Sequence, residues 1–204
     1  KKTVALGIKR YELGPGGLSI AEKIQDRVLE KLVRAKVAGR FGGRLKAFVS
    51  GGAPLNYDIG VFFLALGVRL LQGYGQTETA PVVSANLPDK IKIDTVGPAF
   101  PSVELKIAAD GEILVRGELT MQGYWNAPEL TAEALRDGWV YTGDIGELDD
   151  DGYIKITDRK KDIIVNSGGD NVSPQRVEGA LVFEPEITQA MVYGDKRPHL
   201  VAVL

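Results

Sequence analysis

Residues 143–172 constrain the fold of this chain more than any other stretch, because they combine a tight turn with charged residues at fixed spacing. Apolar and polar residues alternate on both sides of an Asp-Asp-Asp-Gly turn at 149–152. An Asp-Gly pair between alternating apolar residues is a strong signal for a β-hairpin. The sequence therefore predicts a hairpin with strands at 145–148 and 153–156.

Two charged residues flank the predicted hairpin, and its turn determines how close they lie. Asp144 and Arg159 are fifteen positions apart, and the turn folds the chain back, so we expect them to lie near one another at one end of a sheet. A carboxylate beside a guanidinium is suited to hold the two hydroxyls of a sugar. The same pair is also typical of a surface salt bridge, and the residues by themselves leave both interpretations open.

The first half of the chain predicts a parallel α/β layer. Apolar residues at 45–49 and 68–71 indicate two buried strands, and the nearly all-apolar segment 57–66, followed by Gly67, indicates a helix between them. The strands run into loops of small residues at 50–54 and 73–79. In parallel sheets ligands bind at the carboxyl ends of the strands, so we expect a site where the two loops converge.

A helix at 20–37 precedes this layer. Ser19 and Glu22 have the spacing of a capping box, apolar residues follow every four positions, and Gly39 is expected to stop the helix. We expect the apolar side to pack on a larger body. The opposite side carries Lys23, Arg27, Lys31 and Arg34, and we interpret it as a solvated face, with contact to an anionic membrane as the minority interpretation.

From residue 96 the pattern changes to short strands and turns, which predict a small antiparallel sheet or open barrel. The clearest hairpin there joins 103–107 to 112–116 through Asp110-Gly111. Further elements are predicted near the end of the chain: a strand at 163–165, a helix opened by Ser173-Pro174, and strands at 190–193 and 200–204. We assign the chain to the α/β class, with mixed α+β character.

Composition limits the partners. The formal net charge of −2 over 204 residues argues against nucleic acid. The sequence has no cysteine, which excludes disulfides and fits a cytoplasmic protein, and its one histidine, His199, argues against a His-based triad or multi-His metal site. No run of about eighteen apolar residues is present, so we expect no membrane-spanning helix.

The loop at 73–79 carries groups suited to a nucleotide. Thr77 and Glu78 can bind phosphate and its Mg²⁺, which proteins usually hold with one or two carboxylates plus substrate phosphates. Tyr74 can offer a flat face to a purine, with residues 52–54 on the other side. The structural alternative is a plain turn with an exposed glutamate and a packed tyrosine. The loop at 167–169, taken alone, is a turn.

Four motifs together resemble a known family. They are Ser-Gly-Gly-Ala-Pro-Leu at 50–55, Gly-Tyr-Gly-Gln-Thr-Glu at 73–78, Tyr-Thr-Gly-Asp at 141–144 and Asp-Arg-Lys-Lys-Asp at 158–162. Their order and rough spacing resemble the adenylate-forming enzymes: acyl-CoA synthetases, firefly luciferase and peptide-synthetase adenylation domains. The resemblance spans essentially the whole chain, and it is strongest to long-chain fatty acid–CoA ligases of bacteria.

The resemblance implies a role for each candidate residue. The nucleotide-binding set is Gly52, Ala53, Pro54, Gly73, Tyr74, Gly75, Thr77, Asp144 and Arg159. Within it, Gly52, Ala53 and Tyr74 would line the adenine slot, Thr77 would contact the α-phosphate, and Asp144 with Arg159 would hold the ribose hydroxyls. Glu78 would hold Mg²⁺, Lys161 would be the hinge, Gly168 and Gly169 would border the coenzyme A tunnel, and Thr79, Ala80 and Pro81 would lie near the acyl carboxylate.

The implied reaction has two steps. A fatty carboxylate attacks the α-phosphate of ATP to give acyl-adenylate and pyrophosphate, and the thiol of coenzyme A then displaces AMP. The phosphate-binding loop that ends in Pro-Lys-Gly and the late catalytic lysine of the family are missing from the sequence. We therefore expect a piece of a longer enzyme, inactive in isolation, with residues 1–158 as the second half of the large domain and 159–204 as the hinge and an incomplete small domain.

Several alternatives stay open. Within the family the acid could be an aryl or short-chain acid, or the chain could derive from a peptide-synthetase adenylation domain. From another class, the chain could be a non-catalytic nucleotide-binding module. An incomplete domain exposes apolar surface, so we also expect self-association. The apolar substrate suggests, in addition, peripheral contact with the inner face of the membrane.

Overall fold

The computed structural model describes residues 1–14 and 16–204 of the chain and divides into two compact units. Unit 1 consists of Lys1–Phe100 together with Asp151–Tyr153, and unit 2 consists of Pro101–Asp150 and Ile154–Leu204. Each unit contains its own sheet and its own buried apolar side chains.

Unit 1 is built on a three-stranded sheet in the order β1-β2-β3. Strands β1 (Phe48–Ser50) and β2 (Leu70–Tyr74) pair in parallel, and β3 (Ser84–Ala85) pairs antiparallel with β2. Helix α4 (Tyr57–Ala65) connects the two parallel strands, and Gly67, with φ of 80°, follows its end. The predicted strand–helix–strand unit is confirmed, with β2 extending three residues beyond the predicted strand.

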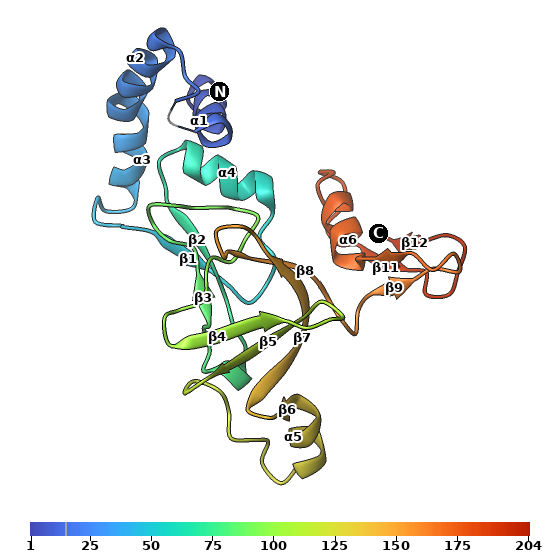
Figure 1. The fold of residues 1–204 in the computed structure, drawn as a ribbon. Coiled ribbons are helices and arrows are strands. Elements are labelled where there is room, and N and C mark those ends of the chain that lie inside the picture. The colour runs from blue at the N-terminus through green and yellow to red at the C-terminus, as the bar shows by residue number, and fades with distance from the viewer. Residues whose placement is uncertain (15) are drawn as a thin grey trace. The chain divides into compact units, whose positions relative to one another are not determined.

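Helix α1 (Lys2–Leu13) packs against α4, as Figure 1 shows. The contact is close because Gly7 has no side chain: a Cβ at that position would lie 2.5 Å from the Cα of Ala65. The packing buries Leu6, Val61 and Ala65. No helix was expected at this place in the sequence.

The predicted helix at 20–37 exists in three pieces: α2 (Ile20–Leu29), the π-helical turn η1 (Glu30–Arg34) and α3 (Ala35–Arg40). The capping box is confirmed, since Ser19 Oγ accepts a hydrogen bond from Glu22 N at 3.3 Å and Glu22 Oε2 accepts one from Ser19 N at 2.9 Å. Gly39 does not stop the helix, which continues to Arg40 before two glycines with positive φ at 42 and 43.

The expected orientation of this helix is wrong in two respects. The apolar residues Ile20, Ile24, Val28 and Leu32 are 47% to 80% exposed. Arg34, expected on the solvated face, is 2% exposed and donates from Nε to the Ala65 carbonyl at 2.9 Å.

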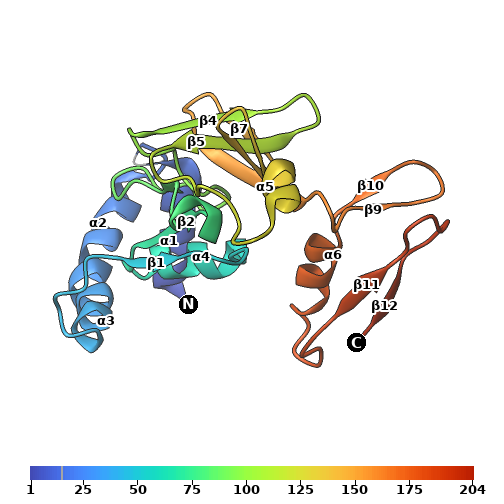
Figure 2. The ribbon, with the colours of Figure 1, turned by 90° about the horizontal axis from the view of Figure 1, so that it is seen from below.

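Unit 2 contains a five-stranded antiparallel sheet along the path β4-β5-β7-β6, with β8 also pairing with β7 (Figure 2). The strands are β4 (Val103–Ile107), β5 (Glu112–Gly117), β6 (Leu135–Arg136), β7 (Trp139–Leu148) and β8 (Ile154–Arg159). Both predicted hairpins, β4–β5 and β7–β8, are confirmed. The core of this sheet includes Ile113, Val115, Val140 and Ile154, each at most 1% exposed.

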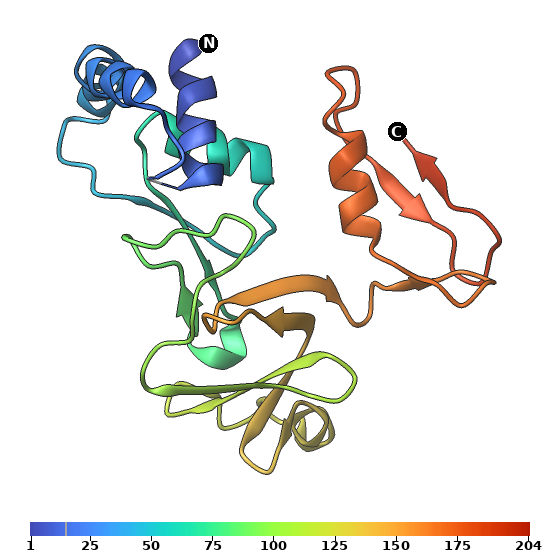
Figure 3. The same ribbon diagram turned by 45° about the horizontal axis from the view of Figure 1, so that its top comes forward.

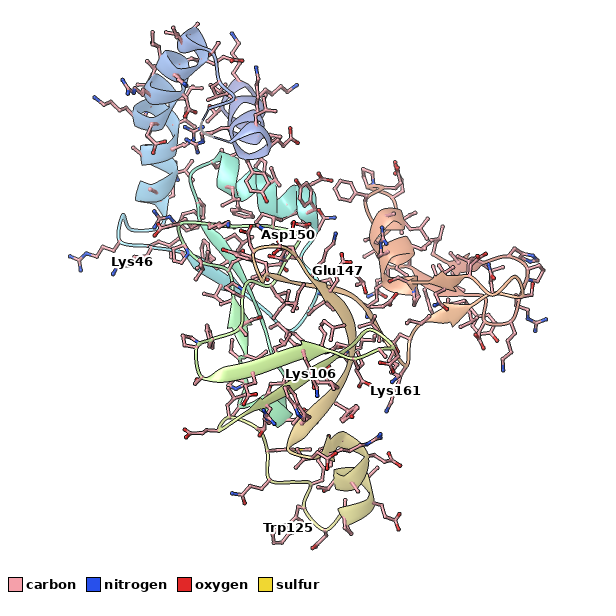
Figure 4. All side chains as sticks on the ribbon, in the orientation of Figure 1. Lys46, Lys106, Trp125, Glu147, Asp150 and Lys161 are labelled. Carbon is pink, nitrogen blue, oxygen red and sulfur yellow. The ribbon has the colours of Figure 1, made fainter. Side chains whose placement is uncertain are left out.

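The connection between β5 and β6 contains helix α5 (Pro128–Ala134), which begins with proline in its first turn. Trp125, in the loop before this helix, is 90% exposed and projects outward in Figure 4.

The last part of unit 2 contains short elements: β9 (Ile164–Val165), β10 (Asn171–Val172), α6 (Pro174–Leu181), β11 (Met191–Tyr193) and β12 (Val201–Val203). Helix α6 lies beside β11 and β12 in Figure 3. The two elements α6 and β11 are also joined by a hydrogen bond, since Glu178 Oε1 accepts from Val192 N at 2.8 Å. The predicted start of α6 is confirmed, because Ser173 Oγ accepts a hydrogen bond from Arg176 N at 3.3 Å.

Among the described residues, none of the helices combines the length and the apolar character needed to cross a membrane.

Candidate functional site

The first candidate loop of unit 1 follows β1. Residues 51–54 are exposed, and Gly52 has φ of 82° with no atom within 4 Å of the place where a Cβ would stand. The loop ends at Asn56, whose Oδ1 accepts a hydrogen bond from Ile59 N at 3.2 Å and thereby caps α4. Gly52, Ala53 and Pro54 therefore present accessible backbone at the carboxyl end of a strand.

The structure brings the first residue of this loop to the carboxyl end of β2. A Cβ on Gly51 would lie 3.2 Å from the carbonyl oxygen of Gly73, so the two glycine backbones approach each other closely. The approach follows from the parallel pairing of β1 and β2, in which Ser50 is opposite Gln72. The carboxyl ends of the two strands therefore lie side by side, as the sequence predicts.

The glycine at 75 has a structural reason. A Cβ there would lie 2.0 Å from the carbonyl oxygen of Pro81, so only glycine allows the loop to fold back on its own return segment. Between them lies η2 (Thr77–Thr79), a turn of 3₁₀-helix followed by Ala80 with φ of 41°. Thr77 is exposed and Glu78 half-buried.

Thr79 holds this turn together. Its hydroxyl accepts a hydrogen bond from Gln76 N at 2.9 Å and donates to the Gln76 carbonyl at 3.1 Å, and the residue is 1% exposed. Ala80 and Pro81 are exposed beside it. Of the three residues expected near the acyl carboxylate, Thr79 thus has an observed structural role.

Two buried side-chain amides stabilise the backbone next to the loop that follows β2. Gln72 in β2 donates from Nε2 to the carbonyl of Ile93, and Asn86 donates from Nδ2 to the carbonyl of Thr95 at 2.7 Å. Both amides are less than 9% exposed. Tyr74, expected to offer a flat face to adenine, is itself 8% exposed.

The candidate pair of unit 2 lies where β7 and β8 pair. Asp144 is directly opposite Arg159 in the ladder, and Arg159 Nε donates to Asp144 Oδ1 at 3.2 Å. The Asp144 side chain is 5% exposed and the Arg159 side chain 60% exposed. The structure therefore brings the two residues together as predicted, with a buried acid and an accessible guanidinium.

The part of β7 that carries Asp144 is held on both sides. Gly143, with φ of 72°, donates its N–H to Glu112 Oε1 at 2.8 Å, and its carbonyl accepts a hydrogen bond from Lys160 N at 2.7 Å. Asp144 N donates to Thr142 Oγ1 at 3.1 Å. These bonds fix the backbone on each side of the candidate pair.

Lys160 forms a small charge cluster with two acids. Its Nζ donates to Asp110 Oδ2 at 2.6 Å and to Glu112 Oε2 at 2.8 Å. The hydrogen bonds to Asp110 and Glu112 raise the pKa of Lys160, and the bond from Lys160 lowers the pKa of Asp110. The Lys160 ammonium and the Asp110 carboxylate are therefore both charged at neutral pH.

Two further predicted residue groups lie after β8. Lys161, labelled in Figure 4, is exposed in the segment between β8 and β9. Gly168 and Gly169 lie in an exposed loop in which Asn166 Oδ1 accepts hydrogen bonds from Gly168 N and Asp170 N, both at 2.9 Å. This is an ordered turn whose glycine backbone is accessible.

Comparison with known proteins decides the family. The AMP-binding enzyme family matches residues 19–125, which is more than half of the chain. This chain belongs to the AMP-binding enzyme family. The AMP-binding chain spans about a third of the length of the curated relatives it matches.

Two relatives of this AMP-binding chain are named for different acid substrates. Long-chain-fatty-acid–CoA ligase FadD15 of Mycobacterium bovis is 43% identical over 189 residues, covering 93% of this chain and 32% of the relative. Feruloyl-CoA synthase of an Amycolatopsis species is 40% identical over 166 residues, covering 76% of this chain and 34% of the relative. Both are CoA ligases or synthases by name.

A solved structure shares the fold. O-succinylbenzoate coenzyme A synthetase of Bacillus subtilis, solved with ATP and a magnesium ion, superposes with a TM-score of 0.68 at 28% identity. The match covers 82% of this chain and 39% of that chain. The mixed α/β fold expected from the resemblance, that of the acyl-CoA synthetases, is confirmed.

The residues around Glu78 fit a magnesium ion only when a bound nucleotide supplies further oxygen ligands. Over residues 1–14 and 16–204, no three His, Cys, Asp or Glu side chains gather as a metal site. Mg²⁺ is commonly held by one or two carboxylates together with phosphate oxygens and water. A single carboxylate at Glu78 therefore fits a metal that arrives with a nucleotide.

Sequence reasoning missed the residues that support the candidate groups. Glu112 and Gln72 are buried polar residues within strands, and no motif or spacing singles them out. A polar residue in an otherwise apolar strand, as in Glu-Ile-Leu-Val at 112–115, is the only signal that could have pointed to Glu112.

Proposed function

We propose that this chain supplies the nucleotide-holding part of an AMP-forming ligase that activates a carboxylic acid with ATP and transfers it to coenzyme A. The observation that carries the proposal is the Asp144–Arg159 pair, in which a buried carboxylate and an accessible guanidinium face each other at 3.2 Å. Acceptor and donor side by side suit the two hydroxyls of a ribose, because each hydroxyl can both donate and accept a hydrogen bond.

The remaining roles follow the same proposal. Adenine would lie against the backbone of Gly52, Ala53 and Pro54 and the loop formed by Gly73, Tyr74 and Gly75. The accessible backbone of the first loop and its convergence with the second support this assignment. The exposed hydroxyl of Thr77 would donate to the α-phosphate, and Glu78 would hold Mg²⁺.

The chemistry depends on positioning and charge. When bound, Mg²⁺ supplies positive charge to the phosphate oxygens on which negative charge develops. Asp144 and Arg159 bind and orient the sugar, so the α-phosphate is held in place while the acid carboxylate attacks it. Holding two reactants in the right geometry can account for a large part of a rate enhancement.

We also propose that Lys161 is the hinge and that residues 159–204 begin a second, smaller domain. In this proposal, rotation about Lys161 exchanges the groups around the nucleotide between the adenylation and thioester-forming steps, and brings Gly168 and Gly169 to coenzyme A. The exposure of Lys161 and of residues 167–170 supports it.

For the acid, we propose a long-chain fatty acid. The name of the 43% identical relative supports this choice, and Thr79, Ala80 and Pro81 would lie nearest the acyl carboxylate. An aryl acid is the alternative, favoured by a relative named feruloyl-CoA synthase at 40% identity.

The test is ATP–pyrophosphate exchange by the longest reading frame that contains this sequence, offered short, medium and long fatty acids and aryl acids. Exchange that peaks with long chains supports both reaction and substrate. Exchange with an aryl acid keeps the reaction and corrects the substrate. Binding of AMP without exchange for any acid contradicts the ligase and favours a non-catalytic nucleotide-binding module. The 204-residue chain by itself is expected to show no exchange.

The exposed apolar side chains of α2 support a further proposal about partners, namely contact between copies of this chain. Contact of the same helix with an anionic membrane surface is the competing possibility, because Lys23, Arg27 and Lys31 lie on the same exposed segment. Localisation in the cytoplasm stays a prediction.

A further inference from the structure

A single buried carboxylate binds two separate segments next to the candidate nucleotide pair. Glu112 begins β5, and its side chain is 6% exposed. One of its oxygens accepts the N–H of Gly143 at 2.8 Å, and the other accepts Lys160 Nζ at 2.8 Å. Gly143 directly precedes Asp144, and Lys160 directly follows Arg159.

These bonds close a ring. Lys160 N donates to the Gly143 carbonyl at 2.7 Å, so the two segments that Glu112 holds are also bonded to each other. Gly143 thus has both its backbone groups bonded, one to the side chain of Glu112 and one to the backbone of Lys160. The ring lies immediately beside the Asp144–Arg159 pair in the β7–β8 ladder.

We propose that Glu112 is a positioning residue: through Gly143 and Lys160 it sets the backbone of the part of β7 that presents Asp144 and of the segment that leads from Arg159 into Lys161. The proposal rests on the proposed function, since Asp144 and Arg159 are taken to hold the ribose. It adds a residue that touches no substrate and that nonetheless determines how tightly the nucleotide is held.

The charges support this role. A carboxylate that accepts a backbone N–H and an ammonium at the same time makes charge-assisted hydrogen bonds, which are stronger than neutral ones. Glutamine keeps the shape of Glu112, but its amide offers one acceptor oxygen and would turn N–H donors toward either Gly143 N or Lys160 Nζ. Glu112→Gln therefore breaks one of the two bonds without opening a cavity.

The first test uses amide hydrogen exchange, measured by NMR on the 204-residue chain. In Glu112→Gln we expect the amides of Gly143 and Lys160 to exchange about tenfold faster or more, while amides of the β4–β5 ladder are unchanged. Glu104→Gln is the matched control, because Glu104 is 59% exposed and paired with Arg116 on the same sheet. Equal exchange in the two variants would overturn the proposal.

The second test measures nucleotide binding in the longest reading frame. Glu112→Gln is expected to raise the AMP dissociation constant and the KM for ATP about tenfold, with a smaller effect on kcat, and Glu104→Gln to leave both unchanged. A residue that only stabilised the fold would lower the active fraction and leave KM unaltered, so an unaltered KM contradicts the proposal.

A variant of Lys160 keeps the test decisive if Glu112→Gln does not fold. The Lys160 side chain is 47% exposed, so Lys160→Met is expected to fold and to raise the AMP dissociation constant about three- to tenfold. Lys155→Met, at a lysine within β8 whose side chain is 44% exposed, is its control. An AMP dissociation constant that is the same in Lys160→Met as in the wild type would contradict the proposal. Absence of AMP binding in the wild type instead contradicts the proposed function, and the amide hydrogen exchange experiment still decides whether Glu112 fixes the backbone at Gly143 and Lys160.

Discussion

Single residues in this chain gain their positions from several partners at once. Asp144 is held by its place opposite Arg159 in the ladder, by its N–H bond to Thr142 and by the bonded glycine before it. Because the acid is buried and the guanidinium is not, the pair differs from an exposed surface ion pair, which contributes little to stability. Its arrangement suits ligand binding better than it suits stabilisation of the fold.

The residue-scale prediction is that Asp144→Ala weakens binding of ATP or AMP. The lost hydrogen bonds to the ribose are charge-assisted and worth about 1.5–3 kcal/mol, so the dissociation constant should rise about ten- to a hundredfold. Isothermal titration calorimetry on the longest reading frame measures the change. Glu147→Ala, on the same strand but with a side chain 65% exposed, is the control. Unchanged affinity in Asp144→Ala would remove this residue from the nucleotide site.

At the scale of elements, the loop after β2 is folded on itself. Gly75 lies so close to the carbonyl of Pro81 that a Cβ would overlap it. The hydroxyl of Thr79 bonds to both backbone groups of Gln76, and Ala80 has a left-handed backbone conformation. The loop is therefore a fixed turn supported by β2, and its conformation depends on the absence of one side chain.

Gly75→Ala is expected to lower the free energy of unfolding by about 3 kcal/mol, because the added methyl group would overlap the Pro81 backbone. Gly39→Ala should have the opposite sign. That glycine lies inside α3 with no atom within 4 Å of an added Cβ, so alanine should stabilise the chain by about 0.5–1 kcal/mol. Urea denaturation of the three proteins tests both signs. A Gly75→Ala protein as stable as the wild type would contradict the close packing.

A pH-dependent prediction concerns the start of α2. The hydrogen bond from Lys9, together with the bond from Ser19 N, lowers the pKa of Glu22 from 4.5 to about 2. A lowered carboxylate pKa stabilises the folded state fully above pH 4.5, and the contribution is lost as the pH falls through about 2. The difference in unfolding free energy between wild type and Glu22→Gln should be constant above pH 4.5 and vanish near pH 2.

Denaturation at a series of pH values measures this difference. The pair is exposed, so the effect should also shrink at high salt. A difference that persists unchanged below pH 2 would show that Glu22 acts through something other than its charge.

Much at this scale could be predicted from local signals. The Asp-Gly turns at 110–111 and 151–152 predicted two hairpins, and the second hairpin predicted the meeting of Asp144 and Arg159, because a local turn fixes the pairing around it. The capping box at Ser19 likewise depends on residues three apart. Such features need no knowledge of the rest of the chain.

The features that could not be predicted from the sequence depend on contacts between segments that are far apart in it. Helix α1 was missed because Gly7 lowers helix propensity, and the reason for that glycine is its contact with Ala65. Arg34 was assigned to solvent because it is charged, yet its guanidinium binds the Ala65 carbonyl and Asp26. Glu112 was overlooked for the same reason: its partners lie 31 and 48 positions away.

For the whole molecule, the exposed apolar residues of α2 and of the π-helical turn η1 are the feature that bears on its state in solution. Ile20, Ile24, Val28 and Leu32 follow each other every four residues and are 47% to 80% exposed. A row of this kind, one above the other along a helix, favours association because contact removes apolar area from water.

We expect sedimentation velocity to show concentration-dependent association of the chain. The double substitution Ile24→Glu with Leu32→Glu should raise the midpoint concentration more than about tenfold, since each buried apolar side chain contributes about 1.5–3 kcal/mol. Lys23→Glu, a charge change on the same helix, is the control. A wild-type chain that stays monomeric but pellets with anionic vesicles would contradict contact between copies and favour a membrane surface.

Unit 1 includes three residues, Asp151–Tyr153, that come from the tip of the β7–β8 hairpin. Tyr153 is 2% exposed and its hydroxyl donates to the Lys90 carbonyl at 2.8 Å, while Lys90 and Lys92 both bind Asp151. A hybrid gene with one crossover near residue 100 would therefore combine the lysines of one parent with the tyrosine and aspartate of the other. Recombination within this family should succeed more often when a second crossover returns the hairpin tip to the parent that supplied residues 1–100.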